Sequence, residues 1–378
     1  MNVTSMSTSI KSCWVELNRK NLAHNVGIFR TLIGDARLLA AVVKSDAYGH
    51  GMVGVARTAL EAGVDWLHVF SVAEGVSLRA AGVDAPVLVL GPAFETEVAP
   101  ALDAGLRLTV ADAHSAKMVA EARIRGKVHL KLETGTNRQG LRPAEVPDVV
   151  AILSGAGVVV EGAYTHYADI EDTTDHSFAN DQLERFRAAI STLRLTLPHT
   201  ACSAAAILFP DTYFKMVRVG IALYGLWPSA ETRVSAQMYG RNTLDLAPVM
   251  TWKTRVSQIK TVPAGEYIGY GRTYRCTRDS RVAILPVGYA DGYPRALSNV
   301  GHVLIHGMRA PVRGRICMNL SMVDVTDIPQ AAHGDEVVLL GKQGSEQVTA
   351  DALAKLAGTI NYEIVTRAAP GAPRIWVD

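Results

Sequence analysis

The chain has 378 residues, 48% of them hydrophobic and 20% charged, which is enough apolar sequence for two domain cores and argues against a disordered adaptor. The 38 basic and 36 acidic side chains are interspersed, so no Lys/Arg block follows a nucleic-acid backbone. Apolar runs such as 38–43 are much shorter than a membrane-spanning helix requires, which argues against a membrane partner.

The amino-terminal segment is polar over its first dozen residues and lacks the apolar stretch of a secretory signal. We therefore expect a cytoplasmic protein. A short strand is predicted next, at 13–17. The four cysteines are widely separated and form no CxxC pair, so we expect neither a disulfide framework nor a metal site.

Strands and helices alternate regularly over 18–245. Alanine-rich segments, with apolar residues three and four apart, separate eight short β-prone runs, which lie at 38–44, 66–70, 87–90, 107–110, 128–132, 158–166, 199–202 and 216–220. This α/β pattern predicts a (β/α)8 TIM barrel. A doubly wound open sheet has the same local pattern and is the alternative.

The pattern changes over 246–378. Val, Ile and Thr alternate with polar residues and are interrupted by Gly and Pro, as in RVSQIKTVPAGEYIGYGRTY. A mostly β carboxyl-terminal domain is predicted here, and the strand at 13–17 is expected to join its sheet.

Lys44 ends the first predicted barrel strand, in AAVVKSDAYGHG. TIM-barrel active sites are built at the carboxyl ends of such strands. Apolar surroundings make an amine a poorer ammonium, and a lowered pKa suits it to attack a carbonyl and form a Schiff base. A surface lysine that keeps its charge in water is the alternative, and the commoner one for a lysine considered alone.

A phosphate site is predicted after the last two barrel strands. Ser203 begins an alanine-rich helix in HTACSAAAIL, and Gly220 and Ile221 follow the next strand. Free N–H groups at a helix start bind phosphate, and the last loops of TIM barrels often do so. An ordinary serine N-cap is an equally good interpretation of Ser203.

Arg218 lies inside an apolar strand ending, MVRVGIALYG. A buried guanidinium is costly unless it is paired, so some group must face it. One interpretation is a structural ion pair with a barrel carboxylate. The other is a pyridine nitrogen, which arginine would leave unprotonated because it only donates hydrogen bonds.

Weaker signals come from three further segments. Lys131 and Arg138 lie in KLETGTNRQG and His166 lies in YTHYADIED, at the carboxyl ends of predicted barrel strands, while Tyr270 lies in EYIGYGRTY of the β-rich part. Taken alone, the tyrosine segment is more typical of a strand and turn with packed aromatic residues.

In this order and spacing, these segments closely resemble bacterial alanine racemases, which are pyridoxal phosphate (PLP) enzymes with a TIM barrel followed by a β-domain. The resemblance runs from about Cys13 to Val377. Its most specific parts are AVVKSDAYGHG, MVRVGIALYG, GYGRTY, LPVGYADGYPR, GRICMN and TINYEIVTR. It implies interconversion of L- and D-alanine by a homodimer, in the supply of D-alanine for peptidoglycan.

The resemblance also implies roles for matched residues. Lys44 would hold the cofactor's aldehyde as a Schiff base, Arg218 would meet the pyridine nitrogen, and Tyr270 of the partner subunit would be the second base on the opposite face of Cα. Residues matched to cofactor contacts are Tyr48, His166, Ser203, Gly220, Ile221 and Tyr362.

Other matched residues belong to the substrate side. Arg138 would face the cofactor's phenolic oxygen, oriented by Lys131, which is carbamylated in many relatives. Met318 would lie near the substrate carboxylate, with Asn319 beside it.

Asn319 stands where the family usually has Asp, and Cys202 stands where it usually has Asn. Serine racemase domains also have Asn at the first position, so serine is a rival or second substrate. An Asn319 amide that hydrogen-bonds a serine hydroxyl would favour serine; alternatively, Asn319 only satisfies a local turn.

Three other functions are considered. A PLP-dependent decarboxylase normally sets a carboxylate against the pyridine nitrogen, which Arg218 argues against. A non-catalytic PLP-binding protein would lack the second domain with Tyr270. A structural protein on the same fold would leave the joint presence of Lys44, Arg218 and Tyr270 unexplained.

Overall fold

The computed structural model describes residues 12–241 and 244–378. Most of the polar first dozen residues, on which the expectation of no secretory signal rests, lie outside this range. The chain divides into two compact units, one made of 19–248 and the other of 1–18 with 249–378. Each unit is described by itself.

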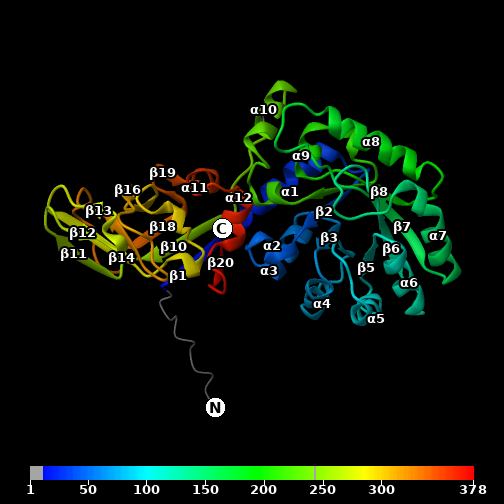
Figure 1. Cartoon of the computed structure of the whole chain (residues 1–378), viewed down its shortest axis with the longest axis horizontal. Coiled ribbons are helices and arrows are strands. Elements are labelled where there is room, and N and C mark those ends of the chain that lie inside the picture. The colour runs from blue at the N-terminus through cyan, green and yellow to red at the C-terminus, as the bar shows by residue number, and fades with distance from the viewer. Residues whose placement is uncertain (1–11, 242–243) are drawn as a thin grey trace, which may run out of the picture. The chain divides into compact units, whose positions relative to one another are not determined.

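The unit 19–248 is an eight-stranded parallel sheet with helices (Figure 1). Its sheet order is β8-β7-β6-β5-β4-β3-β2-β9. The strands are β2 (Leu38–Val42), β3 (Trp66–Val69), β4 (Val87–Val89), β5 (Arg107–Val110), β6 (Lys127–Lys131), β7 (Val159–Tyr164), β8 (Leu197–His199) and β9 (Met216–Val219). Backbone hydrogen bonds from Lys215 N to Pro198 O (3.1 Å) and from Arg218 N to Ala201 O (3.2 Å) join the two end strands. The predicted α/β barrel is confirmed.

The helices of this unit are α1 (Arg19–Ile33), α2 (Lys44–Tyr48), α3 (Met52–Glu61), α4 (Val72–Ala80), α5 (Glu95–Asp103), α6 (Ala113–Glu121), α7 (Val146–Gly155), α8 (Ser177–Ile190), α9 (Ser203–Leu208) and α10 (Ala230–Met238). Figure 1 shows α4 to α7 following the outer side of the strands. Side-chain hydrogen bonds define where two of these helices begin. Ser71 and Glu74 form a capping box before α4, and Asp112 and Ser115 form one before α6.

The barrel strands are buried because both faces of a parallel sheet are covered, which explains their continuous apolar runs. Side chains from strands around the ring pack into one interior cluster, so the barrel is filled and not a pore. Its buried members are Ala40, Trp66, Leu88, Tyr164 and Met216.

The other unit is mostly β. A seven-stranded sheet has the order β16-β15-β18-β10-β1-β20, with β19 paired to β18, and smaller sheets join β11-β14-β17 and β12-β13. The strands are β1 (Cys13–Asn18), β10 (Met250–Arg255), β11 (Gln258–Val262), β12 (Tyr267–Ile268), β13 (Tyr274–Arg275), β14 (Ser280–Leu285), β15 (His302–Ile305), β16 (Met308–Pro311), β17 (Ser321–Asp324), β18 (Glu336–Gln343), β19 (Glu346–Val348) and β20 (Arg374–Val377). Two helices, α11 (Ala350–Ala357) and α12 (Asn361–Arg367), complete it.

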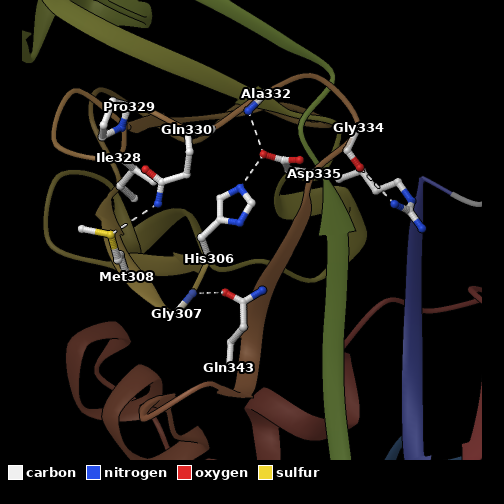
Figure 2. A network of polar contacts seen from close by, with 12 residues as sticks. His306, Gly307, Met308, Ile328, Pro329, Gln330, Ala332, Gly334, Asp335 and Gln343 are labelled. Atoms are coloured by element: carbon white, nitrogen blue, oxygen red, sulfur yellow. Dashed lines mark hydrogen bonds and ion pairs between the residues drawn. The ribbon is translucent and has the colours of Figure 1, made fainter.

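The β15–β16 turn of this unit is held by polar contacts (Figure 2). His306 Nε2 lies 2.7 Å from the Asp335 carboxylate, which also accepts a hydrogen bond from Ala332 N at 2.7 Å. Gly307 N donates to Gln343 Oε1 at 2.9 Å. Burial alone would raise the pKa of Asp335, but the Ala332 and His306 contacts lower it overall. The network therefore favours an ionised Asp335.

Within the described part of the chain, no helix is long and apolar enough to span a bilayer.

Candidate active site

Lys44 follows β2 after a single residue, Val43, and begins α2, which is a left-handed turn. The four residues after it, Ser45 to Tyr48, have φ of +53° or +54°. Asp46 Oδ1 holds the turn by accepting a hydrogen bond from Met52 N at 2.8 Å. Left-handed geometry costs an L-residue roughly 1–2 kcal/mol, and such strain is typical of functional sites. The strained turn sets Lys44 at the carboxyl end of the barrel.

The Lys44 amine is half-buried and electrostatically unusual. Burial lowers its pKa most, the charge of Arg138 lowers it further, and Glu74 raises it only in part. Glu74 is itself occupied, because it accepts hydrogen bonds from Ser45 N at 2.6 Å and Phe70 N at 2.7 Å. A larger neutral fraction makes the amine a better nucleophile toward a carbonyl carbon.

Several predicted residues meet around His166. Burial, followed by the charges of Lys131, Arg218, Arg138 and Lys44, holds the pKa of His166 well below its ordinary value. Lys131 is only 6% exposed and Arg218 only 4%. Burial, Arg218 and Arg138 likewise hold the pKa of Lys131 well below its usual range. The structure thus gathers cationic groups at one end of the barrel, where they favour an anionic ligand.

The partners of Arg218 are neutral. One guanidinium nitrogen donates to His199 Nδ1 at 2.7 Å and to His199 O at 3.2 Å. The other donates to the carbonyls of Thr165 and Thr200, both at 2.9 Å. Over 12–241 and 244–378, no carboxylate forms an ion pair with Arg218. The structural ion pair considered from the sequence is therefore not what the described chain contains.

Tyr48, Ser203 and Gly220 come together beside α9. Ser203 Oγ accepts a hydrogen bond from Gly220 N at 3.0 Å. A Cβ on Gly220 would lie 2.6 Å from Tyr48 Oη, so a larger residue there would require the tyrosine to move. Ile221 begins the next 3-10 turn, Ile221–Tyr224. Ser203 is not the N-cap of α9, because Cys202 occupies that position.

The remaining predicted residues lie in the β-rich unit. Tyr270, in the turn between β12 and β13, is 71% exposed, and Met318 is 56% exposed. Asn319 Nδ2 donates to Asp291 Oδ2 at 3.3 Å, which supports the local-turn interpretation of Asn319. Tyr362 lies half-buried on α12. No group of His, Cys, Asp and Glu suited to a metal ion occurs in the described residues of either unit.

Two residues of this site were missed in the sequence. Tyr164 ends β7, and its ring centroid lies 4.6 Å from Lys131 Nζ and 5.3 Å from Arg218 Cζ. These are cation–π distances. His199 ends β8 and hydrogen-bonds Arg218. The available signal was a polar residue within an otherwise buried strand, in VVVEGAYTH and HTAC.

Comparisons with known proteins agree with this arrangement. Family models described as the alanine racemase N-terminal and C-terminal domains match residues 17–228 and 249–376. Alanine racemases from Symbiobacterium thermophilum and Halothermothrix orenii are 43% and 42% identical, covering 97% and 96% of this chain and the same shares of their own. A crystal structure of alanine racemase from Bacillus anthracis with bound L-Ala-P has a TM-score of 0.90 and 34% identity, covering 97% of this chain and 95% of its own. This chain belongs to the alanine racemase family.

Proposed function

We propose that the protein interconverts L- and D-alanine with PLP as its cofactor. The observation that carries this proposal is the presence of two particular groups at one end of the barrel. Lys44 is an amine with a lowered pKa, and Arg218 is a buried guanidinium whose hydrogen-bond partners are all neutral. The first suits attack on an aldehyde, and the second suits a pyridine nitrogen that stays unprotonated.

The residues present fit this cofactor. The missing Cβ of Gly220 leaves room next to Tyr48 Oη and Ser203 Oγ, where a phosphate would be held together with Ile221 N. Arg218 would meet the ring nitrogen, with His166 nearby. When bound, PLP supplies a conjugated system that withdraws electrons from the substrate's Cα and makes its proton acidic.

The chain's own groups then move that proton. On one face, Lys44 Nζ would hold or return the Cα proton, and on the other face Tyr270 Oη of the partner subunit would do so. Arg218 only donates hydrogen bonds, so it would leave the ring nitrogen unprotonated and limit side reactions such as transamination. Arg138 would face the ring oxygen, and the backbone of the partner's Met318 would lie near the substrate carboxylate. Two bases on opposite faces invert the centre.

We also propose a homodimer in which Tyr270 of the partner subunit completes each site. Support comes from the exposure of a tyrosine and nearby apolar side chains in the β-rich unit: Tyr270, Met318 and Leu320 are 71%, 56% and 45% exposed. Mixing Lys44→Ala with Tyr270→Phe chains tests this, because a heterodimer regains one site with both bases intact. No recovery after verified subunit exchange would contradict sharing.

A carbamylated Lys131 is part of the same proposal. Its amine is buried, its pKa is well below the usual range, and no carboxylate pairs with it in the described chain. A neutral amine can add carbon dioxide, and the resulting carbamate anion would pair with Arg138. A carbamate signal in 13C spectra under 13CO2, absent from Lys131→Ala, is the expected result.

Other substrates and reactions are less well supported. The neutral partners of Arg218 argue against a decarboxylase, which needs a carboxylate at the pyridine nitrogen. The amide of Asn319 is engaged with Asp291, and the relatives compared are alanine racemases, so serine is not favoured. Cytoplasmic location and supply of D-alanine for peptidoglycan stay predictions.

A chiral assay of purified protein with PLP and a panel of L-amino acids tests the proposal. We expect D-alanine from L-alanine, and no D-alanine from Lys44→Ala. Borohydride should fix the cofactor to Lys44 in the wild type. Lys117→Ala, at an exposed position of α6, is the control and should behave as wild type. Cofactor fixed to Lys44→Ala by borohydride would overturn the assignment.

A further inference from the structure

The interior of the barrel contains a line of polar side chains beneath Arg218. TIM-barrel interiors are usually filled with branched apolar residues, and a buried polar group is costly unless it is paired. Here His68, His129 and His199 are fully buried, and Glu161 is 7% exposed. Three of these four form a connected chain that ends at Arg218. The catalytic scheme above does not use them.

The contacts form a line through the barrel interior from Arg218 to Glu161. Arg218 donates to His199 Nδ1 at 2.7 Å, His199 Nε2 lies 2.9 Å from His129 Nδ1, and His129 Nε2 lies 3.6 Å from Glu161 Oε2. The last contact is longer than a hydrogen bond and is electrostatic. The absence of a side chain at Gly162 leaves room for the His129 ring, because a Cβ there would lie 2.6 Å from His129 Nδ1.

Both imidazoles are neutral. Burial, followed by the charge of Arg218, holds the pKa of His199 well below its ordinary value. Burial also lowers the pKa of His129, although Glu161 acts in the opposite direction. A neutral imidazole has one donor nitrogen and one acceptor nitrogen. A contact that fixes the role of one ring nitrogen therefore also fixes the role of the second nitrogen of the same ring.

The tautomers follow from the chemistry of arginine. Arginine only donates, so His199 Nδ1 must accept and His199 Nε2 must carry the proton. His129 Nδ1 then accepts that proton's hydrogen bond, so His129 Nε2 carries a proton that faces the Glu161 carboxylate. A proton on His199 Nδ1 would oppose the Arg218 N–H group and push the guanidinium away.

We propose that Glu161 is a positioning residue that, from the end of the line opposite Arg218, favours the same tautomers of His129 and His199 and thereby helps to hold the Arg218 guanidinium in place. This inference rests on the proposed function only for its catalytic consequence. Glu161 also pairs with Lys127 at 2.6 Å and Arg107 at 3.3 Å. A purely structural role in that cluster is the competing explanation, and it predicts a change in stability with no change in tautomers.

The first experiment reads the tautomers directly. Histidine labelled with 15N is introduced into wild-type holoenzyme, Glu161→Gln and the control His68→Leu, and resonances are assigned with a His129→Gln variant. His68 is buried in the same interior and its ring centroid lies 5.8 Å from that of His199, but neither of its nitrogens has a hydrogen-bond partner in the described chain. In wild type and in His68→Leu we expect proton-bearing Nε2 and bare Nδ1 at both positions. Glu161→Gln should show protonation of Nδ1 in part of the His129 population, because its amide can donate to His129 Nε2.

The second experiment reads the consequence at the cofactor. We expect Glu161→Gln to shift the absorption spectrum of the bound cofactor and to lower the ratio of racemisation to transamination by about 3- to 10-fold, because part of the population would lose the hydrogen bond from Arg218 to His199 Nδ1. Glu161→Asp, which keeps the charge, should recover part of this ratio. The control His68→Leu should keep the wild-type spectrum.

Two results would overturn the proposal. One is a protonated His199 Nδ1 in the wild type, and the other is unchanged tautomers and an unchanged spectrum in a folded Glu161→Gln protein. The tautomer measurement does not depend on catalysis. An inactive wild type with the expected tautomers would therefore contradict the proposed function and leave the positioning role standing.

Discussion

Gly220 lies so close to Tyr48 that a Cβ added to Gly220 would stand 2.6 Å from the tyrosine hydroxyl and 3.2 Å from Cζ. The tyrosine cannot easily move, because its ring packs on Tyr224 with centroids 5.1 Å apart. This contact is an obstacle to any larger residue at Gly220.

We therefore predict that Gly220→Ala weakens PLP binding by about 10-fold or more, the loss that about 1.4 kcal/mol of displaced contacts produces. Equilibrium dialysis of the cofactor measures this. The control is Gly155→Ala, at the end of α7, where an added Cβ meets nothing within 4 Å. Equal cofactor affinity in both variants would count against the phosphate location proposed here.

The left-handed turn after Lys44 gives a second prediction. Ser45 is exposed and has φ +53° and ψ +52°, a conformation that glycine adopts without steric cost. We expect Ser45→Gly to raise the free energy of unfolding by up to about 1 kcal/mol, and Ser45→Val to lower it by more than that. Urea unfolding of both variants checks the sign. Destabilisation by glycine would show that the turn is not strained.

Glu161 should make the stability of the barrel depend on pH. Burial alone would raise its pKa, but its contacts with His129 and Lys127 and the charge of Arg107 lower it to about 2. The native state therefore binds protons more weakly than the unfolded state. Its contribution is complete above the unfolded pKa of about 4.5 and is lost as pH falls toward 2.

Integrated from about 4.5 to about 2, this difference in pKa contributes about 3 kcal/mol. Unfolding by urea at pH 6 and pH 3 should show a smaller pH-dependent loss in Glu161→Gln than in wild type. Parallel losses in both proteins would mean that other carboxylates dominate acid unfolding.

The hydrogen bond between Asn319 and Asp291 gives a further prediction. Asn319→Asp would replace the donor by a second carboxylate beside Asp291, where the present distance is 3.3 Å. Because the site is exposed, we expect a loss of about 1 kcal/mol at pH 7. Thermal unfolding at pH 7 measures this. Asn319→Ala serves as a control, since it removes the donor without adding charge.

The control variant Asn319→Ala also tests the choice of substrate. With its amide engaged by Asp291, Asn319 is a poor donor to a substrate hydroxyl, and we expect the serine-to-alanine ratio of kcat/KM to change less than 2-fold in Asn319→Ala. A several-fold fall in this ratio would restore the serine hypothesis.

The barrel could be predicted because parallel strands are buried on both faces, so runs such as WLHV and RLTV stand out from their surroundings. The turn at 45–48 could not, since none of its four residues is glycine and tertiary contacts impose the left-handed backbone. The partner of Arg218 was also beyond prediction. His199 is nineteen positions away on a neighbouring strand, and no local pattern links the two residues.

Deuterium incorporation from D2O tests the central claim most directly. Purified protein with PLP and L-alanine in D2O should yield equal amounts of L- and D-alanine, each carrying deuterium at Cα, since the enantiomers have equal free energy. Lys44→Ala and Tyr270→Phe should each lose most of the conversion. L-alanine that gains no deuterium and forms no D-alanine, or that releases carbon dioxide, would contradict the account.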